Sequence, residues 1–307
     1  MTDNNPHVVE RELNQHDLSQ LNALSAIATA SNAPKHGTRY RLIFGLKTAK
    51  CLDNLYFRLI EKLDIDVLVE CGAHEGTASF RAVTELKKSA IAIEANPYVF
   101  RQKTLQLQKY GVMALNFALD TTAGQVALKV PKGKSNSSTK GSLLPRTEGA
   151  TEEVTCEART LDSIAAQYLP ERNSVGLWID VEGATSRVLR GASKILQGGR
   201  CKIIKVEVES VSFWQNQTKA HEIDLYLRKH KFVPIARDCE YRNQYNIIYV
   251  PMRYLEPVES DVFCFWQDLG RLKLAPSDWI FPFSLQRNRL ILNRSSVFRR
   301  LAAILRP

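Results

Sequence analysis

The chain has 307 residues, of which 44% are apolar, enough to bury one large core or one domain with extensions. Its formal net charge is +10, from 42 lysine and arginine residues against 32 aspartate and glutamate residues. After Asp278 the chain contains six arginines and no acidic residue, so much of the basic excess belongs to this last segment and says little about the central fold.

The cysteine pattern and the hydropathy exclude several classes of protein. The six cysteines form no Cys-x-x-Cys pair and no Cys/His cluster with zinc spacing, which fits a reducing compartment. The first residues are polar and acidic, unlike a secretory signal, and no apolar run approaches the roughly 20 residues of a membrane span. We therefore expect a cytoplasmic protein, with a peripheral position at the inner membrane surface as the alternative.

Strands and helices are predicted to alternate along most of the chain. Residues 1–45 are expected to be a polar N-terminal arm with one helix, and residues 46–63 have the apolar period of a helix. Apolar runs then predict five strands, at 66–71, 90–94, 112–117, 175–181 and 201–208. Amphipathic stretches predict helices at about 77–88, 97–109, 184–196 and 219–230. Apolar strands bounded by helices are typical of a parallel sheet that is covered on both faces.

Two further strands, at 231–236 and 245–250, are separated by a linker too short for a crossover helix, so they should be antiparallel. The predicted fold is α/β, a Rossmann-like seven-stranded sheet, mostly parallel with an antiparallel terminal hairpin and helices on both faces. This is the sheet of class I methyltransferases rather than that of dehydrogenases.

An insert of about 124–158 interrupts the alternation. It contains two strand-like segments, at 124–130 and 153–158, joined by a loop rich in glycine, serine and lysine that we expect near the mouth of the pocket. The predicted organisation is therefore a domain over 46–250 that carries this insert, followed by a basic, aromatic-containing C-terminal extension over 251–307.

The segment from Asp66 to Thr77 predicts a strand followed by a glycine-containing turn, and Glu94 ends the next strand. Gly72 and Gly76 would let the backbone approach a ligand without a side chain in the way. A carboxylate placed like Glu94 accepts hydrogen bonds from both hydroxyls of a ribose. The Gly-x-x-x-Gly spacing lacks the middle glycine of the NAD fingerprint, which favours a cofactor without phosphates, such as S-adenosylmethionine. The turn alone could be local turn chemistry; Glu94 makes a nucleoside pocket the better interpretation.

Asp180 and Glu182 stand at the carboxyl end of the strand predicted over 175–181. Ligands of open α/β sheets bind at this end. A single acid here could cap the following helix or pair with an arginine. Two acids that flank Val181 and precede Gly183 favour a role in function.

Several motifs resemble those of the FkbM-type methyltransferase family, over about residues 65 to 250. They are Glu70-Cys-Gly-Ala-His-Glu-Gly76, Glu94-Ala-Asn-Pro97, Gly141-Ser-Leu-Leu144, Thr160-Leu-Asp162, Asp180-Val-Glu-Gly183 and Val188-Leu-Arg-Gly191. The resemblance implies S-adenosylmethionine as cofactor and methylation of a hydroxyl, often on a sugar or another natural product.

The pocket pattern and the resemblance together predict one cofactor-binding set. It comprises Glu70, Gly72, Ala73, His74, Gly76, Thr77, Glu94, Ala95, Asn116, Asp120 and Asp180. Two members depart from the family pattern, which has Asp and Asn where this chain has Glu70 and His74. Glu70 would reach the methionine amino group, whereas His74 would contact the methionine carboxylate, face the acceptor, or serve only as a hydrogen-bonded turn residue.

Methyl transfer to a hydroxyl requires alignment of the acceptor and a place for its proton. Asp180 is the first candidate for the base, with Glu182 and His74 as alternatives. Instead of a base, a metal held by oxygen ligands such as Asp180 and Glu207 could assist, but the sequence gives no firm sign of one, and none is predicted.

The expected partner is a small-molecule or glycan acceptor; nucleic acid is not expected, because the sequence has no reader motif. Residues 295–306 predict an amphipathic helix with a basic face, which would dock on the protein's own core or a partner subunit, or contact an anionic membrane or glycolipid. Homo-oligomerisation stays open. The competing functions are an NAD-dependent oxidoreductase and a non-catalytic scaffold that binds S-adenosylmethionine.

Overall fold

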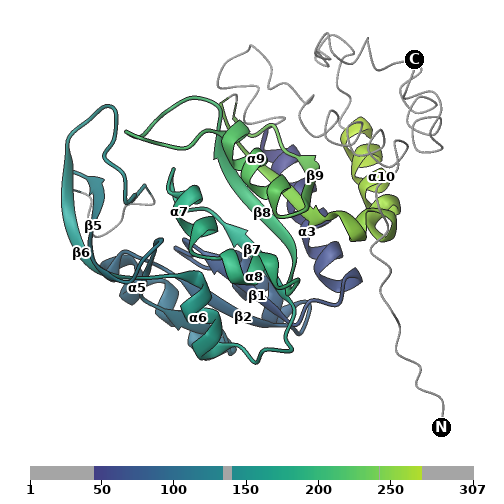
Figure 1. The fold of residues 1–307 in the computed structure, drawn as a ribbon, viewed down its shortest axis with the longest axis horizontal. Helices are drawn as coiled ribbons and strands as arrows, with labels where there is room; N and C mark the ends of the chain where they lie inside the picture. Colours follow the sequence, from purple (N-terminus) through teal and green to yellow (C-terminus); the bar gives the residue numbers. More distant parts are fainter. Residues whose placement is uncertain (1–44, 134–139, 242, 272–307) are drawn as a thin grey trace.

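A computed structural model describes residues 45–133, 140–241 and 243–271. These residues form a central sheet with helices on both sides, and a smaller sheet beside it (Figure 1). The N-terminal arm up to residue 44, the centre of the insert loop and the helix expected over 295–306 lie outside the described residues.

The central sheet has seven strands in the order β3-β2-β1-β7-β8-β10-β9. The strands are β1 (Val67–Cys71), β2 (Ser89–Ile93), β3 (Met113–Leu115), β7 (Val175–Ile179), β8 (Cys201–Glu209), β9 (Phe232–Arg237) and β10 (Gln244–Pro251). Neighbours are parallel except that β10 runs antiparallel to both β8 and β9. The predicted class I methyltransferase sheet, with its antiparallel terminal hairpin, is confirmed.

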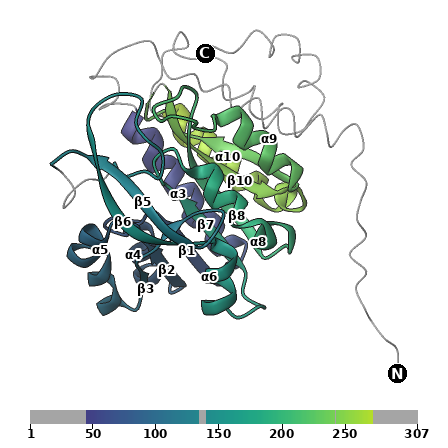
Figure 2. The same ribbon diagram turned by 60° about the vertical axis from the view of Figure 1, so that its left-hand side comes forward.

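Each face of the sheet buries its own apolar cluster, as expected for strands that are apolar on both sides. One face is covered by α3 (Leu46–Lys62), α4 (Thr77–Thr84) and α10 (Leu255–Arg271), and the other by α6 (Leu161–Tyr168), α7 (Thr185–Arg190), α8 (Ser193–Gln197) and α9 (Ala220–Lys229). Helix α10, at the start of the expected C-terminal extension, lies beside α3 in both ribbon views (Figures 1 and 2). Its Val258, Val262 and Phe265 are buried in the first cluster, so this part of the extension belongs to the core.

Two of the predicted helices are broken in the structure. The stretch expected over 97–109 consists of α5 (Pro97–Gln102) and the 3₁₀ helix η2 (Thr104–Tyr110), and the stretch over 184–196 is divided into α7 and α8. Gly191 stands at the second break, where a Cβ atom would lie 2.4 Å from the backbone oxygen of Asp120. Helical periodicity does not reveal such a contact, because Asp120 is distant in sequence.

The two strands of the insert and one strand before it form a second, three-stranded sheet, which lies at the left of the central sheet in Figure 1. The two predicted strands are β5 (Gly124–Pro131) and β6 (Thr151–Arg159), which pair antiparallel, and the short β4 (Ala118–Leu119) pairs parallel with β6. Alternate residues of β6 are buried, in the pattern of a strand with one covered face.

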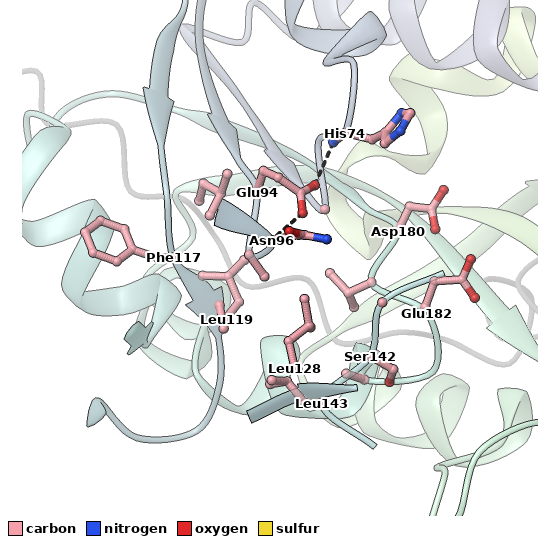
Figure 3. A pocket seen from close by; sticks show the side chains of 17 residues that line it. His74, Glu94, Asn96, Phe117, Leu119, Leu128, Ser142, Leu143, Asp180 and Glu182 are labelled. Carbon is pink, nitrogen blue, oxygen red and sulfur yellow. Dashed lines mark hydrogen bonds between the residues drawn. The ribbon is translucent and has the colours of Figure 1, made fainter. Parts of the chain in front are cut away.

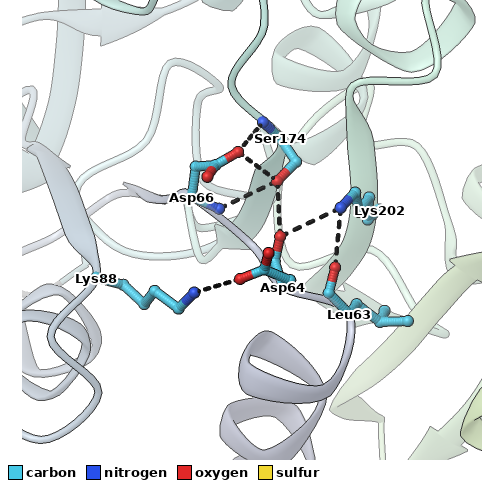
Figure 4. A network of polar contacts seen from close by, with 6 residues as sticks. All are labelled: Leu63, Asp64, Asp66, Lys88, Ser174 and Lys202. Carbon is cyan, nitrogen blue, oxygen red and sulfur yellow. Dashed lines mark hydrogen bonds and ion pairs between the residues drawn. The ribbon is translucent and has the colours of Figure 1, made fainter.

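A polar network ties the amino ends of the central strands together (Figure 4). Ser174, just before β7, donates its backbone N–H and its hydroxyl to Asp66 Oδ2, at 2.7 and 2.8 Å. Lys202 of β8 donates to the backbone oxygen of Leu63 at 2.9 Å. These hydrogen bonds connect the amino ends of β1, β7 and β8, at the edge of the sheet opposite the pocket, and so fix the three strands relative to one another.

None of the helices in the described part of the chain is both long enough and apolar enough to cross a membrane.

Candidate active site

A pocket opens at the carboxyl ends of β1, β2 and β7, where the parallel arrangement brings the ends of distant segments together (Figure 3). It is lined by Gly72, His74, Ile93, Glu94, Ala95, Asn96, Phe117, Ala118, Leu119, Leu128, Gly141, Ser142, Leu143, Asp180, Val181, Glu182 and Ala184. Of the predicted site residues, Gly72, His74, Glu94, Ala95, Asp180 and Glu182 therefore line one pocket.

Glu94 is held by backbone donors on both of its oxygens. The N–H of His74 donates to Oε2 at 2.9 Å, and the N–H of Asn96 donates to Oε1 at 2.8 Å. Burial raises the pKa of Glu94, while these hydrogen bonds and that of Ala95 lower it. Each carboxylate oxygen has a further lone pair, so Glu94 can accept the two hydroxyls of a ribose without losing its own support.

The two glycines of the first turn serve the packing of the protein more than the approach of a ligand. At Gly72 (φ +82°) a Cβ atom would lie 1.8 Å from the backbone oxygen of Asp180. At Gly76 (φ +66°) it would lie 2.1 Å from Leu107 Cδ1. Gly72 lines the pocket, whereas Gly76 is not among the lining residues and leaves its Cβ position to Leu107 of η2.

His74 also adopts a left-handed backbone conformation, with φ +47°. Its ring lines the pocket, and Nε2 lies 3.1 Å from Lys103 Nζ, which also bonds Glu75 Oε1 at 2.7 Å. Burial and the lysine charge lower the pKa of His74, so the ring is neutral and its Nε2 accepts a hydrogen bond that Lys103 donates. The nitrogen that a general base would use is thereby engaged, which favours the alternative of a fixed turn residue.

Glu70 points to the protein's own backbone. Its two oxygens accept the N–H groups of Ala78 and Ser79, at 3.2 and 2.8 Å, in the first turn of α4. A carboxylate there is stabilised by the helix dipole, although burial raises its pKa to about 7. Neither Glu70 nor Ala73 or Thr77 is among the residues that line the pocket.

Asn116 and Asp120 lie next to the pocket without lining it. Asn116 Nδ2 donates to the backbone oxygen of Glu94 at 2.7 Å, which fixes the end of β2. Asp120 accepts Arg187 Nη1 at 2.8 Å. Their described contacts therefore support the site rather than bound an adenine ring.

The apolar wall of the pocket is the part that the sequence did not reveal. Phe117 and Leu119 follow β3, whereas Leu128 and Leu143 come from the insert. Ser142 exchanges backbone hydrogen bonds with Lys129 of β5, at 2.7 and 2.9 Å, so the insert holds Leu143 in place. These four apolar side chains lie in the same pocket as Glu94 and form a surface on which a flat base can pack. The sequence predicted that the insert loop lies near the pocket, but it did not identify these side chains.

Four acidic side chains influence one another at the ends of β7 and β8: Asp180 and Glu182, which line the pocket, and Glu207 and Glu209 on β8, which do not. Burial raises the pKa of Asp180, and that of Glu182 to about 8. The pKa of Glu207 is raised well above its usual value, first by burial and then by the three other acids. Burial raises that of Glu209 to about 7. Carboxyl groups with raised pKa values can take up a proton near neutral pH, which suits a general base.

Glu182 adopts a left-handed backbone conformation (φ +48°), and Gly183 follows at φ +78°. A Cβ atom on Gly183 would lie 2.2 Å from Trp214 Cδ1. The guanidinium of Arg146 lies over the Trp214 ring, and Gln215 N donates to Pro145 O at 2.8 Å. The insert and the loop after β8 therefore contact each other next to Glu182 and Gly183.

In the described ranges, no group of three or more His, Cys, Asp and Glu side chains is arranged to hold a metal ion.

Residues 70–242, more than half of the chain, match the model of the methyltransferase FkbM domain. The chain belongs to the FkbM methyltransferase family. No curated protein matches it.

The chain is also similar to solved structures at low identity. It is 11% identical to M. capricolum TrmK in complex with S-adenosyl-homocysteine, over 81% of this chain and 98% of that one, with a TM-score of 0.35. It is 7% identical to an S-adenosylmethionine-dependent methyltransferase from Clostridium acetobutylicum, over 66% and 91%, with a TM-score of 0.36. For EvdMO1 the identity is 10% and the TM-score 0.35, and the match covers 64% of this chain but only 40% of that chain. These TM-scores are too low to support an argument about function.

Several residues of the FkbM motifs have structural roles in this chain. Thr160 caps α6 by accepting the N–H of Ser163 at 3.0 Å. Asp162 accepts the N–H groups of Lys194 and Ile195, at 2.9 and 3.0 Å, at the start of α8. These contacts fix α6 and α8 beneath the strand that delivers Asp180.

Proposed function

We propose that this chain transfers a methyl group from S-adenosylmethionine to a hydroxyl of a saccharide, a glycoconjugate or another natural product. The observation that carries the proposal is the placement of Glu94 and Asp180 in one pocket, at the ends of β2 and β7, with the turn at Gly72 between them. Membership of the FkbM methyltransferase family supports the reaction class.

The residues of the pocket fit the parts of this cofactor. Glu94 would accept the ribose hydroxyls, since both of its oxygens are oriented by backbone donors. The apolar wall formed by Phe117, Leu119, Leu128 and Leu143 would pack against the adenine. The turn at Gly72 and His74 would hold the methionine end. When bound, the cofactor supplies a methyl group on a positively charged sulfur.

The chain's own task is then to hold the acceptor oxygen in line and to take its proton. Asp180 is the proposed base, because it lines the pocket at a strand end and its burial raises its pKa. Glu182 lies on the acceptor side, next to the contact between the insert and the loop after β8, and would orient an acceptor hydroxyl. An acceptor with several hydroxyls fits a pocket end lined by carboxyl groups, since each carboxyl can accept a hydroxyl hydrogen bond.

Calorimetric titration of the purified protein with S-adenosylmethionine, S-adenosylhomocysteine and NAD tests the cofactor. We expect both adenosyl ligands to bind and NAD not to bind. The Glu94→Ala variant should lose most of the adenosyl affinity, whereas Glu153→Ala, an exposed acid on β6, should not. Binding of NAD alone would refute the proposal in favour of an oxidoreductase.

The chemistry is tested with a panel of saccharide acceptors and radiolabelled S-adenosylmethionine. Wild-type protein should transfer label to one of them, and Asp180→Asn should abolish turnover while leaving S-adenosylhomocysteine affinity within about threefold, less than 1 kcal/mol. Adenosyl binding without transfer to any acceptor would favour the scaffold. Near-normal turnover of Asp180→Asn would remove Asp180 from the mechanism.

A further inference from the structure

Asp180 has a second carboxyl group as its immediate neighbour. Strands β7 and β8 are parallel and in register at Ile179 and Val206, so the next residues, Asp180 and Glu207, stand side by side at the edge of the pocket. A hydrogen bond between their carboxyl groups would lower the pKa of Asp180, and the adjacent strand positions place the two groups for one. Two carboxylates cannot accept from each other, so one member of the pair must carry a proton, and the geometry has to decide which.

Lys205 supplies a bias toward a charged Asp180. It lies two residues before Glu207 on β8 and is 4% exposed, with Nζ 2.8 Å from Asp53 Oδ1 and 3.3 Å from the centre of the Trp178 ring. Its positive charge lowers the pKa of Asp180. A buried lysine anchored by a carboxylate and an aromatic face cannot swing out to solvent, so its effect on the pair is permanent.

Glu207 has the opposite surroundings. The charges that act on it come from Asp180, Glu182 and Glu209, and all three raise its pKa. Gln244 of β10 donates Nε2 to Glu207 Oε1 at 2.8 Å. This hydrogen bond lowers the pKa of Glu207, against the larger effects of burial and the three acids, and it occupies Oε1, so a proton on Glu207 would lie on Oε2.

Besides Lys205 and Glu207, the charged groups that interact with Asp180 are four further acids. Glu70 of β1 and Glu94 after β2 feel its charge, as do Glu182 and Glu209. Among the described residues, Lys205 is the cation that acts on Asp180. Removing Lys205 would therefore leave Asp180 among acids alone.

We propose that Glu207 is the protonated member of this pair and donates a hydrogen bond to an ionised Asp180. The positive charge of Lys205 favours this arrangement over the reverse one. Glu207 and Lys205 are then positioning residues for the base. This inference rests on the proposed methyl transfer for its purpose. During transfer the acceptor O–H bond breaks, its proton goes to Asp180, its oxygen forms the new bond to the methyl group, and the departing sulfur becomes neutral; the proton of Glu207 stays where it was.

Carbon-13 NMR of the full chain, labelled at the Asp and Glu carboxyl carbons, tests the proton placement without any acceptor. Asp180→Asn and Glu207→Gln assign the two signals. At neutral pH we expect Asp180 at the ionised position and Glu207 at the protonated position. Lys205→Met should move the Asp180 signal to the protonated position, whereas Lys229→Met, the same change at an exposed site on α9, should move neither. An ionised Glu207 beside a protonated Asp180 in the wild-type protein would overturn the inference.

Kinetics provides a second test once an acceptor is found. Glu207→Gln keeps a neutral N–H donor for Asp180, so its loss in kcat should be at least about tenfold smaller than that of Asp180→Asn. Lys205→Met should shift the acidic limb of the pH profile of kcat to higher pH. On that limb, kcat should fall about tenfold for each unit by which the pKa of Asp180 rises, and Lys205→Arg should restore the wild-type profile. Equal losses in the two amide variants would refute the proton placement.

The two levels of the proposal fail separately. Wild-type protein that binds no adenosyl ligand would refute the proposed function, while the carboxyl signals would still decide where the proton lies. If Lys205→Met does not fold, as judged by circular dichroism, the wild-type signals and Lys205→Arg decide the inference instead.

Discussion

Replacing Gly72 by alanine should destabilise the protein and displace Asp180. Gly72 has φ +82°, a conformation that costs an L-residue about 1–2 kcal/mol. The new Cβ atom would lie 1.8 Å from the backbone oxygen of Asp180, in a place where Asp180 N donates to Cys71 O at 2.9 Å. Because the obstacle is backbone in a paired strand, it cannot rotate away, and overpacking of this kind costs about 1–3 kcal/mol more.

The expected loss in the free energy of unfolding is therefore about 2–5 kcal/mol, which corresponds to a fall in Tm of roughly 4–20 °C for a domain of this size. Guanidinium and thermal unfolding measure it, and calorimetry with S-adenosylhomocysteine should show weaker binding. The matched control is Gly149→Ala, which has φ +87° but no atom within 4 Å of the added Cβ. Gly149→Ala should lower the free energy of unfolding only by the cost of the left-handed backbone conformation, about 1–2 kcal/mol. Equal losses in the two variants would refute the close contact between the ends of β1 and β7.

Three further predictions concern the pocket. Leu143→Ala should weaken S-adenosylhomocysteine binding about tenfold with little change in Tm, since the side chain lines the pocket from the insert; unchanged affinity would separate the insert from the cofactor site. Asn116→Ala should weaken the same binding severalfold, because the hydrogen bond to the Glu94 backbone is lost, and calorimetry would contradict this if the affinity stayed the same. The pKa values of Glu182 and Glu209, about 8 and 7, lie above the ordinary 4.5, so the folded protein retains protons that the unfolded chain has released. The free energy of unfolding should therefore fall as the pH rises from about 5 to 8, and Glu209→Gln should reduce this fall in urea unfolding. A pH dependence of Glu209→Gln as steep as that of the wild type would contradict the prediction.

Much of the fold follows from local patterns. Apolar runs bounded by amphipathic stretches predict a parallel sheet, and the short linker before β10 predicts its antiparallel direction. The positions of Glu94 and Asp180 were also predictable, since each stands at the carboxyl end of a strand and the ends of parallel strands face the same edge.

Other parts of the site could not be predicted, because they depend on contacts between distant segments. Glu70 and Glu94 both follow an apolar run, yet one binds the backbone of α4 and the other faces the pocket. Gly76 carries the appearance of a ligand-binding glycine, but its missing side chain makes room for Leu107. Local sequence does not distinguish these cases.

The sequence by itself determined which chemical groups stand at the ends of the strands, because side-chain alternation and turn residues are local properties. Only the tertiary structure decided which of them meet. The order β1-β7-β8 places residues far apart in the chain on neighbouring strands, so it brings Glu207 and Lys205 to Asp180. The packing of the insert brings Leu128 and Leu143 to the pocket that Glu94 lines. The raised pKa values of the acidic side chains arise from these contacts between strands and from burial. The spacing of residues along the chain predicts neither.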